Sequence, residues 1–294
     1  MIRIGTSGRG GTFHGQGFAL KTLLDREPLL APVEIREAEE ASIENARRLQ
    51  AGEVEFGFIA ANWIGRACRG EAPFAQRMDL RIAAPMNAGP LFFIARAADG
   101  PRTVADLAGK RVVFGGESSG MAQHAKTIFA ALGLSVQPIF LDFAPGGDAV
   151  MQGAADAQLQ CPIPNPVMTG LAARYAVRVL PYEPAQLERV LAAVPFYRRT
   201  VMRKGALRGI AEDVAQIAVL NLLATHARVA DPVVTALARA VSAGADELAA
   251  LNPLFIGLGE LFAQLRSDGA AAFEKHVPLH PGAAAAYRAR GLLV

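Results

Sequence analysis

Cysteine is scarce in this chain of 294 residues, which contains only Cys68 and Cys161. A framework of structural disulfides needs more cysteines, and one pair is compatible with either an oxidising or a reducing compartment. Long apolar runs are missing as well. The best candidate for a membrane span, residues 248–265, is interrupted by Asn252 and Glu260. We therefore expect a protein that is not embedded in a membrane.

An excess of charge of one sign is also lacking, because the formal net charge is only +3. The densest basic cluster comprises Arg198, Arg199, Arg203, Lys204 and Arg208. Apart from Tyr197 it has no interleaved aromatic side chains on which bases could stack. We therefore interpret it as a solvated face and expect no nucleic-acid partner. With 52% hydrophobic and 19% charged residues, the composition is that of a globular protein with one large domain or two ordinary ones.

Nucleotide-binding motifs are absent from the glycine-rich segment that follows the first predicted strand. Residues 5–17 are GTSGRGGTFHGQG, and they lead into a predicted helix over 15–25. Position 13 is Phe where the dinucleotide fingerprint needs glycine, and Lys21 does not follow a glycine as it does in a P-loop. Glycines can turn several backbone N–H groups toward one point at a helix N-terminus, which attracts an anion. The segment predicts a site for a small carboxylate or, as the alternative, a tight turn without a ligand.

Strands and helices alternate in the first part of the chain. The expected strands are 2–4, 33–37 and 54–60, and the expected helices are 15–25 and 43–50. Ser42 is expected to cap the second helix and Gly52 to end it. Residues 80–95 form a long extended segment, broken at 87–90, that we interpret as a strand crossing between two lobes.

The same order occurs again after this segment: strand 110–114, loop 115–120, and a helix over 121–132 that ends at Gly133. Further strands are expected at 135–141, 157–160 and 177–180, further helices at 147–153, from 167, and at 184–193, 231–250, 253–268 and 281–289, and a second crossing at 214–224. The sequence predicts an α/β fold with two lobes, 1–85 with 215–294 and 86–214. Parallel sheets bind ligands at the carboxyl ends of their strands, so loops 5–17 and 115–120 are expected to face one cleft.

The candidate ligand-binding residues come from these loops and from strand ends. They are Ser7, Gly11, Thr12, Phe13, His14, Asn62, Asn87, Ser118, Ser119, Gly120, Cys161 and Asn165. Thr12 and Ser119 are expected to donate hydroxyl hydrogen bonds to the anion, while the three asparagines bind its other polar end. Phe13 is a candidate for stacking on the ligand, whereas Trp63 is more typical of a core residue.

The histidines and Cys161 carry side chains that can bind ligands or metals. His14 fits a ligand contact as well as it fits a surface role, and we interpret His124 as part of the polar face of its helix. Neither has a partner at metal-ligand spacing, and Pro278 interrupts the pair His276 and His280, so no metal and no cofactor is expected. We interpret Cys161 as an unreactive part of the cleft wall.

A serine hydrolase is the main alternative from another functional class. Gly116-Glu117-Ser118-Ser119-Gly120 matches the nucleophile elbow and stands between a predicted strand and a predicted helix. Ser118 would be the nucleophile, with Asp148 or Asp156 as the carboxylate and His226, His276 or His280 as the base. A hydrolase does not explain the duplicated glycine loop, so we expect a binding protein and not an enzyme.

Several residue blocks, in order along the whole chain, resemble the TAXI family, the solute receptors of TRAP-type transporters. The blocks are Gly5-Thr6-Ser7-Gly8, Gly10-Gly11-Thr12-Phe13, Gly17, Ser42-Ile43-Glu44-Asn45, Leu49-Gln50-Ala51-Gly52-Glu53, Asp106-Leu107-Ala108-Gly109-Lys110-Arg111-Val112, Ser119-Gly120, Leu279-His280-Pro281-Gly282-Ala283, Tyr287-Arg288 and Gly291-Leu292. The resemblance implies a type II periplasmic-binding-protein fold, with a hinge and a cleft between two lobes. It also implies a small organic anion as ligand, a glutamate-like amino acid or a dicarboxylate, and TRAP membrane subunits as partners.

The resemblance further implies export to the periplasm. The first predicted strand begins at residue 2, so this chain shows no signal peptide before it. The expectation is therefore a periplasmic protein whose export signal has been removed. A cytoplasmic ligand-sensor module of the same fold is the alternative.

Overall fold

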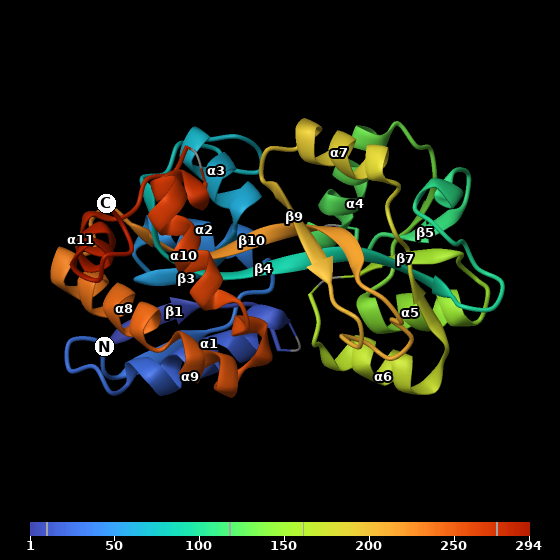
Figure 1. The fold of residues 1–294 in the computed structure, drawn as a ribbon. Coiled ribbons are helices and arrows are strands. Elements are labelled where there is room, and N and C mark those ends of the chain that lie inside the picture. The colour runs from blue at the N-terminus through green and yellow to red at the C-terminus, as the bar shows by residue number, and fades with distance from the viewer. Residues whose placement is uncertain (10, 118, 161, 275) are drawn as a thin grey trace. The chain divides into compact units, whose positions relative to one another are not determined.

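The chain divides into two compact units in a computed structural model that describes residues 1–9, 11–117, 119–160, 162–274 and 276–294. Unit 1 comprises Met1–Ala88 and Leu220–Val294, and unit 2 comprises Gly89–Val219. Figure 1 shows both units as sheets covered by helices. The chain leaves unit 1 along one long strand, β4 (Leu80–Arg96), and returns along another, β10 (Val214–His226).

Unit 1 is built on a mixed sheet in the order β2-β1-β3-β10. Its other strands are β1 (Ile2–Gly5), β2 (Val33–Arg36) and β3 (Phe56–Ala60). Its helices are α1 (Thr12–Leu24), α2 (Ser42–Ala51), α3 (Ala61–Arg69), α8 (Asp231–Ala243), α9 (Ala245–Leu251), α10 (Leu258–Asp268) and α11 (Pro281–Ala289). β1 pairs in parallel with both neighbours, while β10 runs antiparallel to β3. All five residues of β3 are buried, as expected for a strand with both faces covered.

The start and the end of α2 can be compared with the boundaries that the sequence predicts. Gly52 ends α2 in the left-handed conformation at φ 75°, which confirms the predicted stop. The predicted cap is wrong, because Ala41 takes the cap position and Ser42 is already helical. The hydroxyl of Ser42 instead accepts a hydrogen bond from the N–H of Ala60, at the end of β3.

Three further expectations for unit 1 are also corrected. β4 runs without a break through residues 87–90, because neither Gly89 nor Pro90 leaves the extended conformation. The expected helix 231–250 is divided at Gly244 into α8 and α9. The expected helix 253–268 begins only at Leu258, after Gly257 adopts φ 90°.

Unit 2 has the strand order β4-β7-β5-β6, with β8 beside β4 and β9 beside β10. Its strands are β5 (Arg111–Val113), β6 (Gln137–Ile139), β7 (Ala157–Gln160), β8 (Val177–Val179) and β9 (Tyr197–Met202), and its helices are α4 (Gly120–Leu132), α5 (Phe143–Met151), α6 (Pro166–Arg174) and α7 (Pro184–Ala193). The predicted bounds of β7 and α7 are confirmed, as is the end of α4 at Gly133. α5 begins four residues before the expected position.

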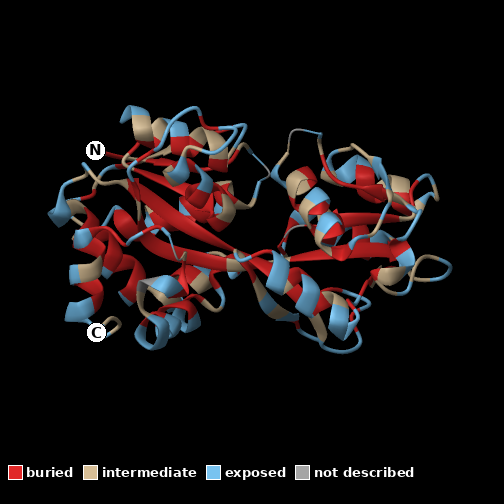
Figure 2. Ribbon diagram, turned by 90° about the horizontal axis from the view of Figure 1, so that it is seen from above, coloured by how far each residue is buried: buried red, intermediate tan, exposed pale blue. Residues whose placement is uncertain are grey.

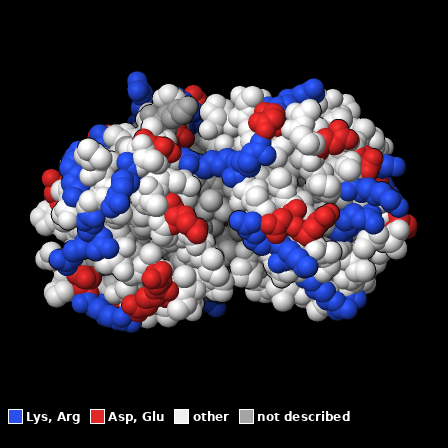
Figure 3. Space-filling model, viewed as in Figure 1, with Lys and Arg blue, Asp and Glu red and all other residues white. Residues whose placement is uncertain are grey.

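Strand β9, like helix α3 in unit 1, was missed by the sequence analysis. It pairs antiparallel with β10 and carries the first two arginines of the basic cluster. Arg199 forms an ion pair with Glu188, and Arg203 forms one with Asp213 at 2.7 Å. These ion pairs support the interpretation of the cluster as a solvated face. Basic and acidic side chains are also interspersed over the molecular face shown in Figure 3.

The buried residues follow the strands and the inward faces of the helices, while loops and outward helix faces are exposed (Figure 2). Each unit therefore has its own apolar core around its sheet. Among the helices of the described residues, none combines the length and the apolar character that crossing a membrane requires.

Candidate functional site

The glycine loop of unit 1 is shorter than the sequence indicates. α1 begins three residues earlier than expected, so Thr12, Phe13 and His14 form its first turn. The N–H of His14 donates to Ser7 Oγ at 3.1 Å and to the carbonyl oxygen of Gly11 at 3.2 Å. Gly11 supplies no side-chain cap, and the first turn contains no acidic residue. This N-terminus therefore keeps the partial positive charge of the helix dipole.

The two rings in this first turn already have partners within unit 1. Phe13 is only 8% exposed and stacks on Phe58 of β3, with ring centroids 5.2 Å apart. It is a core residue, against the expectation that the loop would hold it in the site. His14 is partly exposed, and its Nε2 lies 3.4 Å from Oε1 of Glu37, with its ring against Phe18.

A cluster of amide side chains lies in unit 1 where β4, β10 and α1 meet. Asn87 Oδ1 accepts hydrogen bonds from Gln16 Nε2 and from Asn221 Nδ2, each at 3.2 Å. All three side chains are buried. Asn87 was predicted as a site residue, whereas Gln16 and Asn221 were missed. Asn221 could have been identified from the sequence, because it is the single amide residue in the apolar run 217–224 of β10.

Asn62 lies on a helix and not at the end of a strand, as the sequence analysis expected. Helix α3 begins at Ala61, directly after β3, so Asn62 is its second residue. Its Oδ1 is buried and has no hydrogen-bond partner among the described residues. The neighbouring Trp63 is 5% exposed and packs edge-on against Phe74 at 6.4 Å, which confirms its interpretation as a core residue.

In unit 2 the corresponding loop follows β5 and leads into α4. Gly115 adopts φ 98°, a conformation that only glycine takes readily. Ser119 is the N-cap of α4, and its Oγ accepts a hydrogen bond from the N–H of Ala122 at 3.1 Å. Its hydroxyl proton is left to donate. Gly120 is the first residue of the helix, whose first turn has no acidic side chain, while Ser118 lies outside the described residues.

The described residues do not assemble the catalytic triad of a hydrolase within unit 2. Asp156 binds Arg111 at 3.0 Å where β5 begins, whereas the elbow motif follows the opposite end of that strand. Asp148 pairs with Arg174 on α6 at 3.1 Å. The three candidate bases, His226, His276 and His280, all belong to unit 1.

Two other predicted positions in unit 2 have different outcomes. Asn165 caps α6: its Oδ1 accepts from the N–H of Met168 at 2.8 Å, and its Nδ2 donates to the carbonyl of Pro162 at 2.9 Å. These bonds give the side chain a structural role. Cys161 lies outside the described residues.

His124 is buried and does not belong to the polar face of its helix, which corrects the interpretation from the sequence. Its Nδ1 lies 2.8 Å from the hydroxyl of Tyr197, and the ring packs near Phe196. Burial lowers the pKa of His124 to about 4 and raises the pKa of the Tyr197 hydroxyl. The imidazole is therefore neutral at physiological pH. The prediction failed because the partner lies on β9, which the sequence analysis missed.

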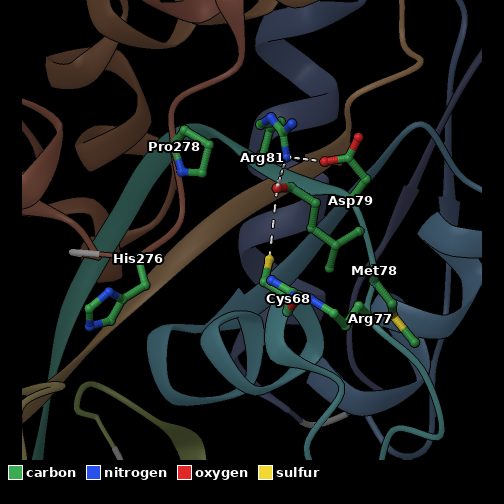
Figure 4. A pocket seen from close by; sticks show the side chains of 8 residues that line it. Cys68, Arg77, Met78, Asp79, Arg81, His276 and Pro278 are labelled. Carbon is green, nitrogen blue, oxygen red and sulfur yellow. Dashed lines mark hydrogen bonds and ion pairs between the residues drawn. The ribbon is translucent and has the colours of Figure 1, made fainter.

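A cavity of about 310 Å³ opens in unit 1, and no residue of the glycine loop lines it (Figure 4). Its lining comprises Cys68, Arg77, Met78, Asp79, Leu80, Arg81, His276 and Pro278. Arg81 is paired with Asp79 and is therefore not available to an anion. Burial raises the pKa of the Cys68 thiol, which keeps it protonated and unreactive.

A second cavity of about 360 Å³ lies in unit 2 beside β8 and the start of β10. Neither cavity includes a residue that was predicted to bind the ligand. Within the described ranges, we find no group of three or more histidine, cysteine, aspartate or glutamate side chains that could hold a metal ion.

Comparison with known proteins gives a family and a fold. The model of a family described as the NMT1-like family matches residues 4–291. The chain is similar in structure to MatC from Rhodopseudomonas palustris with bound malate, at 17% identity and a TM-score of 0.58, over 87% of this chain and 88% of MatC. It is also similar to a structure described as a periplasmic transporter, at 12% identity and a TM-score of 0.55, over 87% of this chain and 85% of the other. The predicted α/β fold of two-lobed periplasmic binding proteins is thereby confirmed.

Proposed function

We propose, from the premise that the chain belongs to the NMT1-like family, that it is a solute-binding receptor that captures a small organic anion and releases it unchanged. The observation that carries this proposal is a pair of similar helix starts. α1 and α4 each follow a loop with glycines and hydroxyl side chains, and neither has an acidic residue in its first turn. Such N-termini attract carboxylates.

The hydroxyls of Thr12 and Ser119 are the side chains that we expect to donate to the anion. Ser119 Oγ already accepts one hydrogen bond from its own helix, and its hydroxyl proton is still available as a donor. Ser7 and Gly11 support the start of α1, and Gly120 starts α4 without a side chain over the backbone donors. The bound malate in MatC, a relative in fold alone, is an anion of the proposed size.

For the finer assignment, we propose a receptor of the TAXI type that delivers its ligand to the membrane subunits of a TRAP-type transporter in the periplasm. The residue blocks shared with that family along the whole chain support this assignment. Genes for TRAP membrane subunits beside the gene for this chain are the expected observation. A neighbouring operon under transcriptional control by this protein would contradict it.

A thermal-shift screen of small carboxylates is the first experiment. A ligand at about a hundredfold above its dissociation constant stabilises the native state by roughly 2.7 kcal/mol. Calorimetric titration of Thr12→Ala and Ser119→Ala with the best ligand then tests the two loops. Each variant is expected to bind about ten- to a hundredfold more weakly, because a hydrogen bond to a charged group is worth about 1.5–3 kcal/mol.

Two threonines on the same helices provide matched controls. Thr22 on α1 and Thr127 on α4 donate their hydroxyls to backbone carbonyls four residues earlier, away from the helix starts. Thr22→Ala and Thr127→Ala are therefore expected to bind the ligand as the wild type does. Unchanged affinity in Thr12→Ala and in Ser119→Ala would refute the assignment of the anion to these loops.

A further inference from the structure

The cavity of unit 2 has no part in the proposed function, because none of its residues belongs to the two helix starts. Its volume of about 360 Å³ lies in the range of small-molecule sites. The lining comprises Arg102, Arg178, Val179, Pro181, Tyr182, Gly209, Ile210, Ala211, Glu212, Asp213, Val214 and Ala215. All of these residues belong to unit 2, so one unit builds the whole cavity.

One wall of this cavity is formed by the loop 203–213, which is held in place by its own contacts. The loop connects β9 to β10, and Arg203 binds Asp213 across its base at 2.7 Å. Gly209 adopts φ 99°, and a Cβ at this position would lie 2.8 Å from the carbonyl oxygen of Val177. The loop therefore packs closely on β8, and this wall is already formed without a ligand.

Two arginines at the cavity carry a charge that no carboxylate neutralises within the described residues. The guanidinium of Arg178 donates to three backbone carbonyls in residues 97–101. Carbonyl oxygens carry no net charge, so these bonds fix the guanidinium without cancelling its charge. Arg102 is exposed, and its guanidinium forms no ion pair within the described ranges. Guanidinium groups bind carboxylates well, so the two side chains favour an anionic ligand.

Two carboxylates also line the cavity, and only one of them is without a cationic partner. Asp213 is bound by Arg203 and also accepts from the N–H of Lys204 at 2.8 Å. Glu212 is exposed and has no ion pair among the residues that the structure describes. Two unneutralised arginines thus stand against one unneutralised glutamate in the lining. This balance favours a ligand with a single negative charge.

The remainder of the lining is mainly apolar and suits a ring. Val179, Tyr182 and Ile210 are buried, and Pro181 and Val214 also face the cavity. Removing an apolar body from water against these side chains is favourable, and an aromatic ring can pack on the ring of Tyr182. The lining therefore fits an anion with an aromatic body better than a small hydrophilic anion.

We propose that this cavity is a second binding site, which takes a small aromatic monocarboxylate. The carboxylate is bound by Arg102 and Arg178, and the ring contacts the apolar part of the lining. This site shares no residue with the loops that precede α1 and α4, so it stands independently of the proposed function.

The test is a fluorine NMR titration of the full chain with 4-fluorobenzoate at constant ionic strength. 4-Fluorobenzamide has nearly the same shape without the charge, and acetate has the charge without the ring. We expect the benzoate to bind about five- to thirtyfold more tightly than the benzamide, because hydrogen bonds to a charged group are stronger than those to a neutral one. Acetate at tenfold excess should not displace the benzoate.

Two variants with opposite expected effects assign the binding to this cavity. Arg102→Gln should weaken the binding of 4-fluorobenzoate roughly two- to fivefold, and Glu212→Gln should strengthen it by a similar factor. Both side chains are exposed, so neither change should disturb the fold. Lys110→Gln is the control, since it removes one positive charge from an exposed residue of unit 2 outside the cavity lining. The control should retain the wild-type affinity.

Each outcome separates this proposal from the proposed function. Equal binding of 4-fluorobenzoate and 4-fluorobenzamide overturns the proposed ligand class, and absence of binding by the benzoate overturns the second site. Affinity that falls in Thr12→Ala or Ser119→Ala, but is unchanged in Arg102→Gln and Glu212→Gln, also overturns the second site, because the compound then binds at the helix starts. None of these results removes the receptor function of the two loops.

Discussion

Replacement of Gly11 by alanine tests whether the start of α1 is as tightly built as the structure indicates. A Cβ at this position would lie 2.3 Å from Ser7 Oγ, 2.8 Å from Ser7 Cβ and 3.2 Å from the carbonyl oxygen of Gly8. The backbone itself tolerates alanine, because φ is −75° and ψ is 154°. The need for glycine at this position is therefore steric and does not come from an unusual backbone conformation.

The expected loss of stability follows from two effects on Ser7. Forcing an additional methyl group into a packed position costs about 1–3 kcal/mol. When Ser7 Oγ moves away, the N–H of His14 loses its 3.1 Å hydrogen bond, which is worth about 0.5–1.5 kcal/mol. Gly11→Ala should therefore lower the free energy of unfolding by roughly 2–4 kcal/mol.

Urea unfolding followed by circular dichroism measures this change, with Gly8→Ala as the matched control. The nearest atoms to a Cβ at Gly8 are the carboxylate oxygens of Glu39, at 3.5 Å, which is ordinary contact. That variant should stay within about 0.5 kcal/mol of the wild type. Ser7→Gly removes the two atoms closest to the new methyl group, so the double variant should lose about 1–2 kcal/mol less than the sum of the single variants. Wild-type stability of Gly11→Ala, or strict additivity with Ser7→Gly, would refute the reasoning.

Three further predictions concern unit 2. Tyr197→Phe should lower the free energy of unfolding by about 1–3 kcal/mol, because it leaves the buried Nδ1 of His124 unpaired; an unchanged urea midpoint would contradict the 2.8 Å contact. The folded pKa of His124, about 4, lies below the unfolded value of about 6.5, so the unfolded chain gains the proton first as the pH falls. Wild type should therefore lose up to roughly 3 kcal/mol more than His124→Gln between pH 6.5 and 4, and parallel stability curves would argue against a neutral buried imidazole. A fluorophosphonate probe should not label the protein, and labelling that disappears in Ser118→Ala would favour the hydrolase.

Local sequence signals predicted the parts of the fold that depend on local chemistry. Gly52 and Gly133 end their helices where expected, since a residue in the left-handed conformation follows the last turn in each case. Helix α3 could not be predicted, because Ala61 follows an apolar strand without a capping residue or a break. β9 was hidden because its adjacent arginines, Arg198 and Arg199, are typical of a surface cluster and not of a strand.

The candidate site was less predictable than the fold, because its contacts join distant positions. Thr12 and Ser119 could be identified from the glycines around them, and whether they bind a ligand stays a prediction. Gln16 could not be found, since its side chain donates to Asn87, which is 71 residues away in the chain. Asn165 could be located at a helix start, but its side chain caps α6. The sequence Asn165-Pro166 would have allowed this cap to be predicted, because proline is common at the first position of a helix.

The interrupted chain path of unit 1 imposes an order on folding during synthesis. Unit 2 is one continuous stretch, Gly89–Val219, and leaves the ribosome complete, whereas unit 1 needs Leu220–Val294 as well. β10 occupies the place beside β3 in the sheet, so the nascent N-terminal third has an open strand edge until the last quarter of the chain is made. Open edges pair readily with other chains. The nascent chain is therefore most prone to aggregation, and most dependent on chaperones, after unit 2 has folded and before β10 pairs with β3.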